Sequence, residues 1–384
     1  MSDYGPDITS AIPVSIGSAD TGWEIRDAVR DIFEIHDITY GIGRANAIRL
    51  RGRLLMDSGR AYDIVDERFR RLDYTPLFRR DGEVDVILAV RAGARVASSR
   101  TTVALVLLAL TILSMLFAGA NGNVVESRGW FWGLLSGWPF AVSLIVILLA
   151  HELGHYFTAR HYGVPVSLPY FIPMPFNVLG TMGAFIQMKA PPKNRRQLLA
   201  IAAAGPLAGF VVAVPVMLVG LFLSEVGSLP SEGVYLMLGN SLLGLALQRL
   251  VFGKLLLGGG EDVFLHGVAL AGWAGFLVTA MNLVPAGQLD GGHVAYALLG
   301  DKAGRLKWAV AVMLFGLGFL WEGWFLWAAL SFVFGRVVAV PLDDVTPLGA
   351  RGRAVAIAVA FIFIMVFTPV PFELVTVLGM APGV

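Results

Sequence analysis

The chain has 384 residues, of which 56% are hydrophobic and 15% are charged, whereas an ordinary soluble protein is about 25% charged. A mean hydropathy of +0.71 excludes a disordered chain, and the absence of cysteine excludes disulfides and thiolate metal sites. A net charge of +1 argues against a nucleic-acid partner. The composition therefore predicts an integral protein of the lipid bilayer.

The charged residues are concentrated near the N-terminus. The first 100 residues hold 15 Arg and 16 Asp or Glu, and the remaining 284 hold 14 Lys or Arg and 12 Asp or Glu. This shift predicts a flexible tail over 1–20, a soluble α+β domain over 21–97 and a membrane-embedded domain over 98–384. The chain as a whole is then a mainly α, polytopic helical membrane protein.

The soluble domain shows alternating helix and strand patterns. The apolar residues of Trp23–His36 are spaced as in a helix, so we predict a helix there. Ala47–Met56 alternates as a strand would. A second helix should begin at Asp57-Ser58 and reach about Leu72. Two further strands, Leu77–Arg80 and Val84–Val90, flank the turn Asp81-Gly82. No catalytic signature occurs here, which favours a regulatory or assembly module.

Seven membrane spans are expected. A span needs about 20 apolar residues, and five runs meet this condition: Thr101–Gly119, Trp138–Ala159, Leu198–Leu223, Val263–Val284 and Ala354–Val370. A sixth run, Leu306–Gly335, is too long for one untilted span, so we divide it in two at Glu322-Gly323. Ser167–Lys189 is apolar but broken by Pro and Gly, which indicates a re-entrant loop or hairpin. Gly239–Leu257 is typical of an interfacial helix.

The short loops predict the orientation of these spans. If the N-terminal domain lies inside, the later inner segments carry eleven Lys or Arg and the outer segments carry three. No signal or transit peptide is visible ahead of Thr101. We therefore expect the N-terminal domain in the cytosol; the missing targeting peptide, together with the family resemblance given below, implies a prokaryotic plasma membrane.

One motif in the second span combines two histidines and a carboxylate, His151-Glu152-Leu153-Gly154-His155. Positions i and i+4 share a helix face, so both imidazoles can bind one metal with Glu152 beside it. An ionisable side chain in a span costs roughly 2–3 kcal/mol or more, which favours a functional role over a polar contact between helices.

A catalytic zinc site takes three protein ligands, and without cysteine the third must be His, Asp or Glu. His161 lies past the inner end of its helix and His266 lies at the outer end of another span. Asp290 follows the inner half of that span, where Pro and Gly break the helix, and it approaches from the same side as His155. His293 is the competing ligand.

These motifs resemble the site-2 protease family of intramembrane zinc metalloproteases. The resemblance rests on the HExxH motif and on Asn282-Leu-Val-Pro-Ala-Gly-Gln-Leu-Asp290-Gly-Gly-His293. Gly205-Pro206-Leu207-Ala208-Gly209 is similar to the family's small-residue motif. The Gly-Gln-Leu-Asp-Gly-Gly-His form and the Asp343-Asp344-Val-Thr-Pro segment are most similar to a prokaryotic branch related to the chloroplast homologues. The likeness extends over about Thr101 to Val370.

The resemblance implies a role for each matching residue. His151, His155 and Asp290 would bind one Zn²⁺ per chain, and Glu152 would be the general base and the proton shuttle to the leaving amine. Asn282 would hold the substrate backbone or polarise the scissile carbonyl. His293 would support the site rather than bind the metal.

The broken stretch around Phe176–Lys189 matches the family's re-entrant β-loop. A substrate helix hides its amides and must unwind before it is cut. An edge strand near Gly183–Gln187 could receive the unwound segment by β-augmentation, which makes Gly183, Ala184 and Phe185 candidate substrate-binding residues.

The expected function is therefore that of an intramembrane zinc metalloendopeptidase that performs regulated proteolysis of single-span membrane proteins. A metal-ion transporter should show ionisable residues through several spans, and these spans carry few. A catalytically silent relative that acts as a membrane chaperone or scaffold should lack one of the four catalytic or metal-binding residues. A different zinc peptidase with a distal Glu ligand is disfavoured because Glu322 and Glu373 lie at the outer ends of spans.

Overall fold

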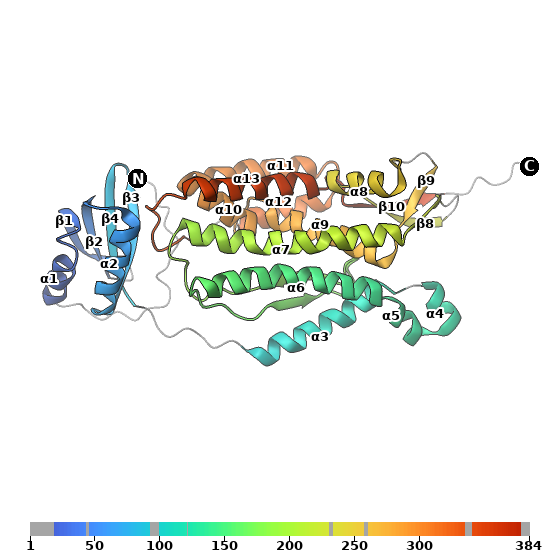
Figure 1. Cartoon of the computed structure of the whole chain (residues 1–384), viewed down its shortest axis with the longest axis horizontal. Helices are drawn as coiled ribbons and strands as arrows, with labels where there is room; N and C mark the ends of the chain where they lie inside the picture. The colour runs from blue at the N-terminus through green and yellow to red at the C-terminus, as the bar shows by residue number, and fades with distance from the viewer. Residues whose placement is uncertain are drawn as a thin grey trace, which may run out of the picture.

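The molecule is elongated, with a small α/β unit at one end and a layered bundle of helices behind it (Figure 1). The computed structural model describes residues 19–43, 46–92, 100–120, 122–229, 233–256, 260–334 and 340–377. The tail expected over 1–20 lies outside these residues apart from its last two.

The α/β unit, residues 19–92, is called the N-terminal unit below. Asp57 caps α2, because its side chain accepts hydrogen bonds from the Gly59 and Arg60 amides. The strands form one antiparallel sheet in the order β1-β2-β4-β3, with an apolar core against the helices. The elements are α1 (Ala19–Asp27), β1 (Phe33–Ile42), β2 (Ala47–Leu54), α2 (Ser58–Arg70), β3 (Tyr74–Asp81) and β4 (Val84–Arg91).

The helix expected over Trp23–His36 is wrong in its second half. The first helix ends at Asp27, and Phe33 already pairs with Leu54 as the first residue of β1. Val29, Ile32 and Phe33 are buried in the same core as the helix, so they satisfy helical spacing without being helical. The spacing of apolar residues indicates which residues are buried, and residues in a turn between two buried elements can continue the same spacing without being helical.

Among the described residues, four helices are long and apolar enough to cross a membrane: α3 (Thr101–Ala118), α6 (Trp138–His161), α7 (Arg195–Phe222) and α13 (Gly349–Val366). Helix α9 (Gly267–Leu283) is one residue shorter than the shortest of these. A turn separates α11 (Ala303–Leu317) from α12 (Gly323–Phe334), at the position expected from Glu322-Gly323. The count of seven spans stays a prediction.

Three of these helices, α6, α7 and α9, pack closely side by side. Glycines allow the contact: a Cβ atom on Gly154 would lie 2.5 Å from the Ala204 carbonyl oxygen, and one on Gly220 would lie 2.1 Å from the Ala269 amide. The interlocked backbones form a fixed frame for the side chains between them.

The end of the bundle away from the N-terminal unit contains four short strands that the sequence patterns did not indicate, together with three short helices, of which only α8 was expected. Strand β7 (Glu225–Ser228) pairs with β9 (Glu261–Phe264), and β8 (Gly233–Leu238) pairs with β10 (Phe372–Val377). Consequently the helical part of the expected span Val263–Val284 begins only at Gly267. The short helices at this end are α4 (Gly122–Arg128), α5 (Trp130–Ser136) and α8 (Leu242–Phe252), the last lying in the predicted interfacial helix.

The broken stretch after α6 forms the expected hairpin, made of β5 (Tyr170–Pro173) and β6 (Thr181–Phe185). Gly180 (φ +68°) lets its turn lie against α3, since a Cβ there would be 2.6 Å from the Ser114 carbonyl oxygen. Within the described part of the chain, β6 is paired on one side only, by β5.

Candidate metal centre

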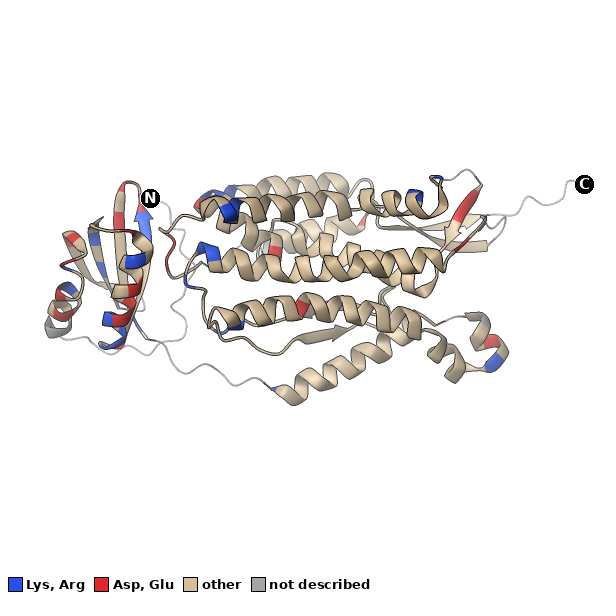
Figure 2. Cartoon of the chain, in the orientation of Figure 1, with Lys and Arg blue, Asp and Glu red and all other residues tan. Residues whose placement is uncertain are grey.

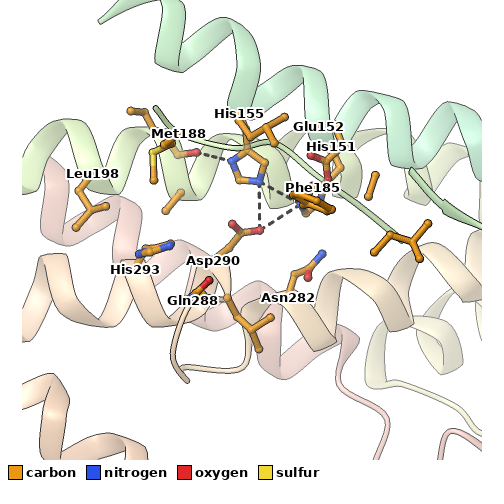
Figure 3. Close-up of a pocket in the computed structure, with 16 residues that line it drawn as sticks. His151, Glu152, His155, Phe185, Met188, Leu198, Asn282, Gln288, Asp290 and His293 are labelled. Atoms are coloured by element: carbon orange, nitrogen blue, oxygen red, sulfur yellow. Dashed lines mark hydrogen bonds and ion pairs between the residues drawn. The ribbon is translucent and has the colours of Figure 1, made fainter. Parts of the chain in front are cut away.

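Helix α6 places the two histidines and the glutamate in the protein interior. His151, Glu152 and His155 are 4%, 4% and 6% exposed, although they belong to a helix of membrane-spanning length. The i and i+4 spacing directs both imidazole rings toward α10, as Figure 3 shows. Ionisable side chains buried within such a helix need a partner, either another ionisable group or a backbone carbonyl.

The carboxylate comes from the turn that follows α9. The chain leaves α9 at Leu283, passes through a short turn, and begins α10 (Asp290–Leu299) with Asp290 as its first residue. Gly291 allows the close approach of the two helix ends, because a Cβ there would lie 2.0 Å from the Leu283 carbonyl oxygen. The glycines after Asp290 therefore bring the start of α10 against the end of α9 and turn the carboxylate toward α6.

Three donor atoms form a nearly equilateral triangle. The Oδ2 atom of Asp290 lies 3.2 Å from Nε2 of His151 and 3.2 Å from Nε2 of His155, and the two Nε2 atoms are also 3.2 Å apart. In a tetrahedral zinc site with bonds of about 2.0–2.1 Å, ligand atoms are roughly 3.3 Å apart. The two imidazoles and one carboxylate thus fit zinc both in chemistry and in spacing.

The backbone of α7 fixes the ring of His155. Its Nδ1 lies 2.7 Å from the Ile201 carbonyl oxygen, which can only accept a hydrogen bond. Nδ1 therefore carries the proton, and the lone pair of Nε2 faces the Asp290 carboxylate. This hydrogen bond sets the tautomer that a metal ligand needs.

Two glycines of α7 make room for the histidine rings. A Cβ on Gly205 would lie 2.0 Å from Nε2 of His155, and one on Gly209 would lie 3.2 Å from Cβ of His151. The Gly205–Gly209 segment therefore serves the site directly as well as the packing of the helices.

Glu152 stands beside the triangle with one free oxygen. Its Oε2 is buried and has no hydrogen-bond partner among the described residues. The cavity next to it has a volume of about 260 Å³. Its wall contains the triad, Glu152 and Asn282, together with apolar side chains from β5, β6 and α7 (Figure 3).

The other predicted residues fall in different places. Ala184, Phe185 and Asn282 line the cavity, whereas Gly183 does not. His293 lines it from the next turn of α10, outside the group of three donors found among the described residues, and its buried Nδ1 has no partner there. His266 caps α9 by accepting a hydrogen bond from the Val268 amide.

Sequence reasoning missed several residues of the site. The Ile201 carbonyl has no signature in the sequence, since every residue carries one. Gln288 and Leu289, which line the cavity beside Asp290, could have been inferred from their place next to a ligand.

Comparison with known proteins gives a consistent result. Residues 139–321 match the model of Peptidase family M50. The probable zinc metalloprotease EGY2, chloroplastic, of Arabidopsis thaliana is 33% identical over 245 residues, which are 62% of this chain and 43% of that protein. The probable zinc metalloprotease EGY1, chloroplastic, of the same plant is 34% identical over 249 residues, 63% of this chain and 44% of that protein.

The chain spans less than half the length of these relatives. The matched region contains α7, α9, α10 and all of α6 except its first residue, and so all four residues of the HExxH and Asp290 site. The chain therefore contains a Peptidase family M50, or site-2 protease, domain and is homologous to the EGY zinc metalloproteases.

Proposed function

We propose that this protein is a zinc-dependent intramembrane endopeptidase that hydrolyses peptide bonds within the membrane spans of single-span proteins. The observation that carries the proposal is the triangle of donors 3.2 Å apart, buried between apolar helices and adjoining a carboxylate with a free oxygen. His151, His155 and Asp290 would hold the zinc. When bound, zinc supplies the Lewis acidity that activates water and polarises a carbonyl.

Glu152 is the proton carrier in this proposal. Its Oε2 takes a proton from the water molecule as the water oxygen bonds to the scissile carbonyl carbon. The same oxygen then gives that proton to the departing nitrogen as the C–N bond breaks, so that the products are a carboxylic acid and an amine, and the proton of the acid then passes to the amine to give a carboxylate and an ammonium group. The amide of Asn282, in the same cavity, donates a hydrogen bond to the substrate carbonyl.

The unwound substrate would lie along β6. The side of β6 away from β5 has no paired strand among the described residues, and Ala184 and Phe185 line the cavity. A peptide in this position regains through β6 the hydrogen bonds that it loses when its helix opens. Gly183, in the middle of this strand, shapes the edge.

A second cavity gives an apolar approach to the site. It has a volume of about 310 Å³, and it shares Gln288 and Leu289 with the first cavity. Its remaining wall comes from β6, the turn before α10 and α12: Met182, Ala286, Gly287, Trp327, Leu330 and Ser331. This lining suits an apolar segment that arrives sideways from the lipid.

The charge distribution supports an orientation with the N-terminal unit on the cytosolic side of the membrane. Lys and Arg gather at the ends of the helices nearest the N-terminal unit (Figure 2). Cations favour the cytosolic side of a bilayer. The proposal includes seven spans, a soluble N-terminal domain and a membrane domain from about residue 98.

The decisive experiment compares wild type with Glu152→Gln in liposomes, with a panel of single-span peptides as substrates. Mass spectrometry reads the products, and the zinc content is measured on the same samples. We expect cuts within the spans by wild type, at least about a hundredfold fewer by Glu152→Gln, and one zinc per chain in both.

Two further variants complete the comparison. His155→Ala should lose both zinc and cleavage, whereas Glu322→Gln, at an exposed position between α11 and α12, should lose neither. Undiminished zinc-dependent cleavage by Glu152→Gln would contradict the assignment of the base. Bound zinc without any cut in wild type would favour the scaffold alternative.

A further inference from the structure

A short segment between α12 and α13 joins the N-terminal unit to the bundle. We call residues 341–346 the docking segment. On one side it pairs with β3: the Phe78 amide donates to the Leu342 carbonyl at 2.9 Å, and the Asp344 amide donates to the Phe78 carbonyl at 3.1 Å. The edge of the N-terminal sheet is thereby joined, through a parallel β-bridge between Phe78 and Asp343, to a segment from the distant C-terminal part of the chain.

The opposite side of the docking segment pairs with the residues that lead into α7. The Leu342 amide donates to the Pro192 carbonyl at 3.0 Å, and the Asp343 amide donates to the Lys193 carbonyl at 2.7 Å. The segment thus lies between two other stretches of backbone, one from each part of the molecule.

Side chains of the N-terminal unit reinforce this arrangement. Nη1 of Arg79 donates to the carbonyls of Pro341 and Leu342, both at 2.9 Å. The hydroxyls of Ser58 and Thr346 are hydrogen-bonded at 2.9 Å, and Lys193 forms an ion pair with Asp63. The docking segment is therefore held by both the backbone and the side chains of the unit.

Asp344 reaches from this segment to two helices of the bundle. Its Oδ1 accepts a hydrogen bond from Nε of Arg195 at 2.7 Å, and its Oδ2 accepts one from the Tyr296 hydroxyl at 2.9 Å. The carboxylate is 8% exposed, and the Arg195 guanidinium also lies over the Tyr296 ring at 5.9 Å. Hydrogen bonds to a charged group so well shielded from water are strong.

The two helices that Asp344 connects are those that complete the metal centre. Arg195 begins α7, which supplies the Ile201 carbonyl to His155. Tyr296 lies six residues after Asp290 on α10, about 9 Å along a rigid helix. Restraining Tyr296 therefore limits both the rotation and the sliding of α10, and with them the place of the Asp290 carboxylate.

We propose that Asp344 is a positioning residue for the metal ligand Asp290, and that the docked N-terminal unit holds Asp344 in place. The inference rests on the proposed function in one respect, the assignment of Asp290 as a zinc ligand. It gives the N-terminal unit a definite part in the reaction: the unit preorganises the site without touching substrate or metal.

The test measures zinc affinity, by competition with a chelator, on the full chain in detergent. Tyr296→Phe removes one hydroxyl, and Asp344→Asn removes the charge. We expect each to weaken zinc binding about 2- to 30-fold, and the double variant to weaken it by less than the product of the two, because both remove the same contact. Lys254→Gln, which breaks an exposed ion pair with Glu261 at the far end of the bundle, is the matched control and should leave zinc affinity unchanged.

A purely structural role would give a different pattern. The melting temperature of the zinc-free protein would fall while zinc affinity stayed within twofold of wild type, and this result would overturn the proposal. If Asp344→Asn fails to fold, Tyr296→Phe alone carries the test. A wild-type chain that binds no zinc would overturn the proposed function as well, so the two failures are distinguishable.

A fourth variant tests the part played by the N-terminal unit. Arg79→Met loosens the docking segment without altering any residue of α7 or α10. We expect the zinc affinity of Arg79→Met to be lower than that of wild type, as for Asp344→Asn. An unchanged affinity would overturn the role of the unit in holding Asp344.

Discussion

The imidazole rings of the metal centre can lie against α7 because that helix lacks side chains where they touch it. At Gly205 even one added carbon would fall 2.0 Å from Nε2 of His155. The Ile201 carbonyl and the absence of side chains at Gly205 and Gly209 therefore shape this site as much as the three donor residues do.

Gly205→Ala is predicted to abolish zinc binding or to weaken it by two orders of magnitude or more, because the methyl group displaces the ring from its position opposite Asp290. Zinc content of the purified variant is the measurement. Gly304→Ala is the control, since a Cβ at that helical position of α11 meets nothing within 4 Å. Full zinc occupancy in Gly205→Ala would show that the ring binds in another orientation.

Asp343 makes the docking segment sensitive to pH. Its Oδ1 accepts hydrogen bonds from the amides of Val345 and Thr346, whereas Oδ2 is buried without a partner among the described residues. Burial raises the pKa of this carboxyl, against the lowering effect of those hydrogen bonds, with Asp344 adding to the increase. Tyr62 and Arg79 also interact with it.

The sign of the effect follows from linkage. A raised pKa means that folding is favoured fully below the unfolded pKa of about 4, and that this contribution is lost as pH rises through the folded pKa. Asp343→Asn cannot ionise, so its melting temperature relative to wild type should increase between pH 4 and pH 8.

Asp31→Asn is the matched comparison for this prediction. The hydrogen-bonded Arg68 guanidinium lowers the pKa of Asp31, so the contribution of Asp31 is present above pH 4 and lost as pH falls. Its melting temperature relative to wild type should therefore decrease slightly as pH rises. Parallel trends in the two variants would contradict the assignment.

At the scale of elements, the β5–β6 hairpin determines how a substrate could be held. Gly183 has φ +96°, a conformation that disfavours any side chain, and a Cβ there would meet nothing within 4 Å. Its role is therefore in the backbone geometry of the strand and not in packing.

Gly183→Ala should raise KM about tenfold, because a strained residue costs about 1–3 kcal/mol or shifts the strand, while zinc affinity stays unchanged. Peptide cleavage kinetics and zinc titration on the same protein would check this. Gly163→Ala carries the same kind of strain (φ +72°) in an open turn after α6 and controls for loss of stability. Equal effects of the two substitutions would remove β6 from the proposed substrate path.

An element could be predicted from the sequence where its buried residues form a long or regular apolar pattern. Helices α3, α6, α7 and α13 follow from long apolar runs, and the grouping of His151, His155 and Asp290 follows from two motifs. Helix α10 was missed because Gly291 and Gly292 suggest a break, whereas in the structure they lie in the first turn of a helix that needs close backbone contact there. Strands β7 to β10 are four to six residues long and show no clear alternation.

At the scale of the whole molecule, the metal centre draws together α6, α7 and α10, so a bound ion links segments far apart in the chain. Saturating zinc, at about 100 times its Kd, should stabilise the fold by about 2.7 kcal/mol. Adding a chelator should therefore lower the melting temperature of wild type. His155→Ala should show no such response, and a response equal to that of wild type would place the ion elsewhere.

The position of the metal centre along α6 has a consequence for any protein cut there. His155 lies 17 residues from the first residue of that helix but only six from the last, His161. A substrate span beside α6 would thus be divided unequally, leaving roughly a quarter of its apolar length on the side of the N-terminal unit. About six apolar residues are too few to anchor a polypeptide in a bilayer. The fragment on that side would be released into water. The other fragment would keep most of the apolar segment and remain in the bilayer.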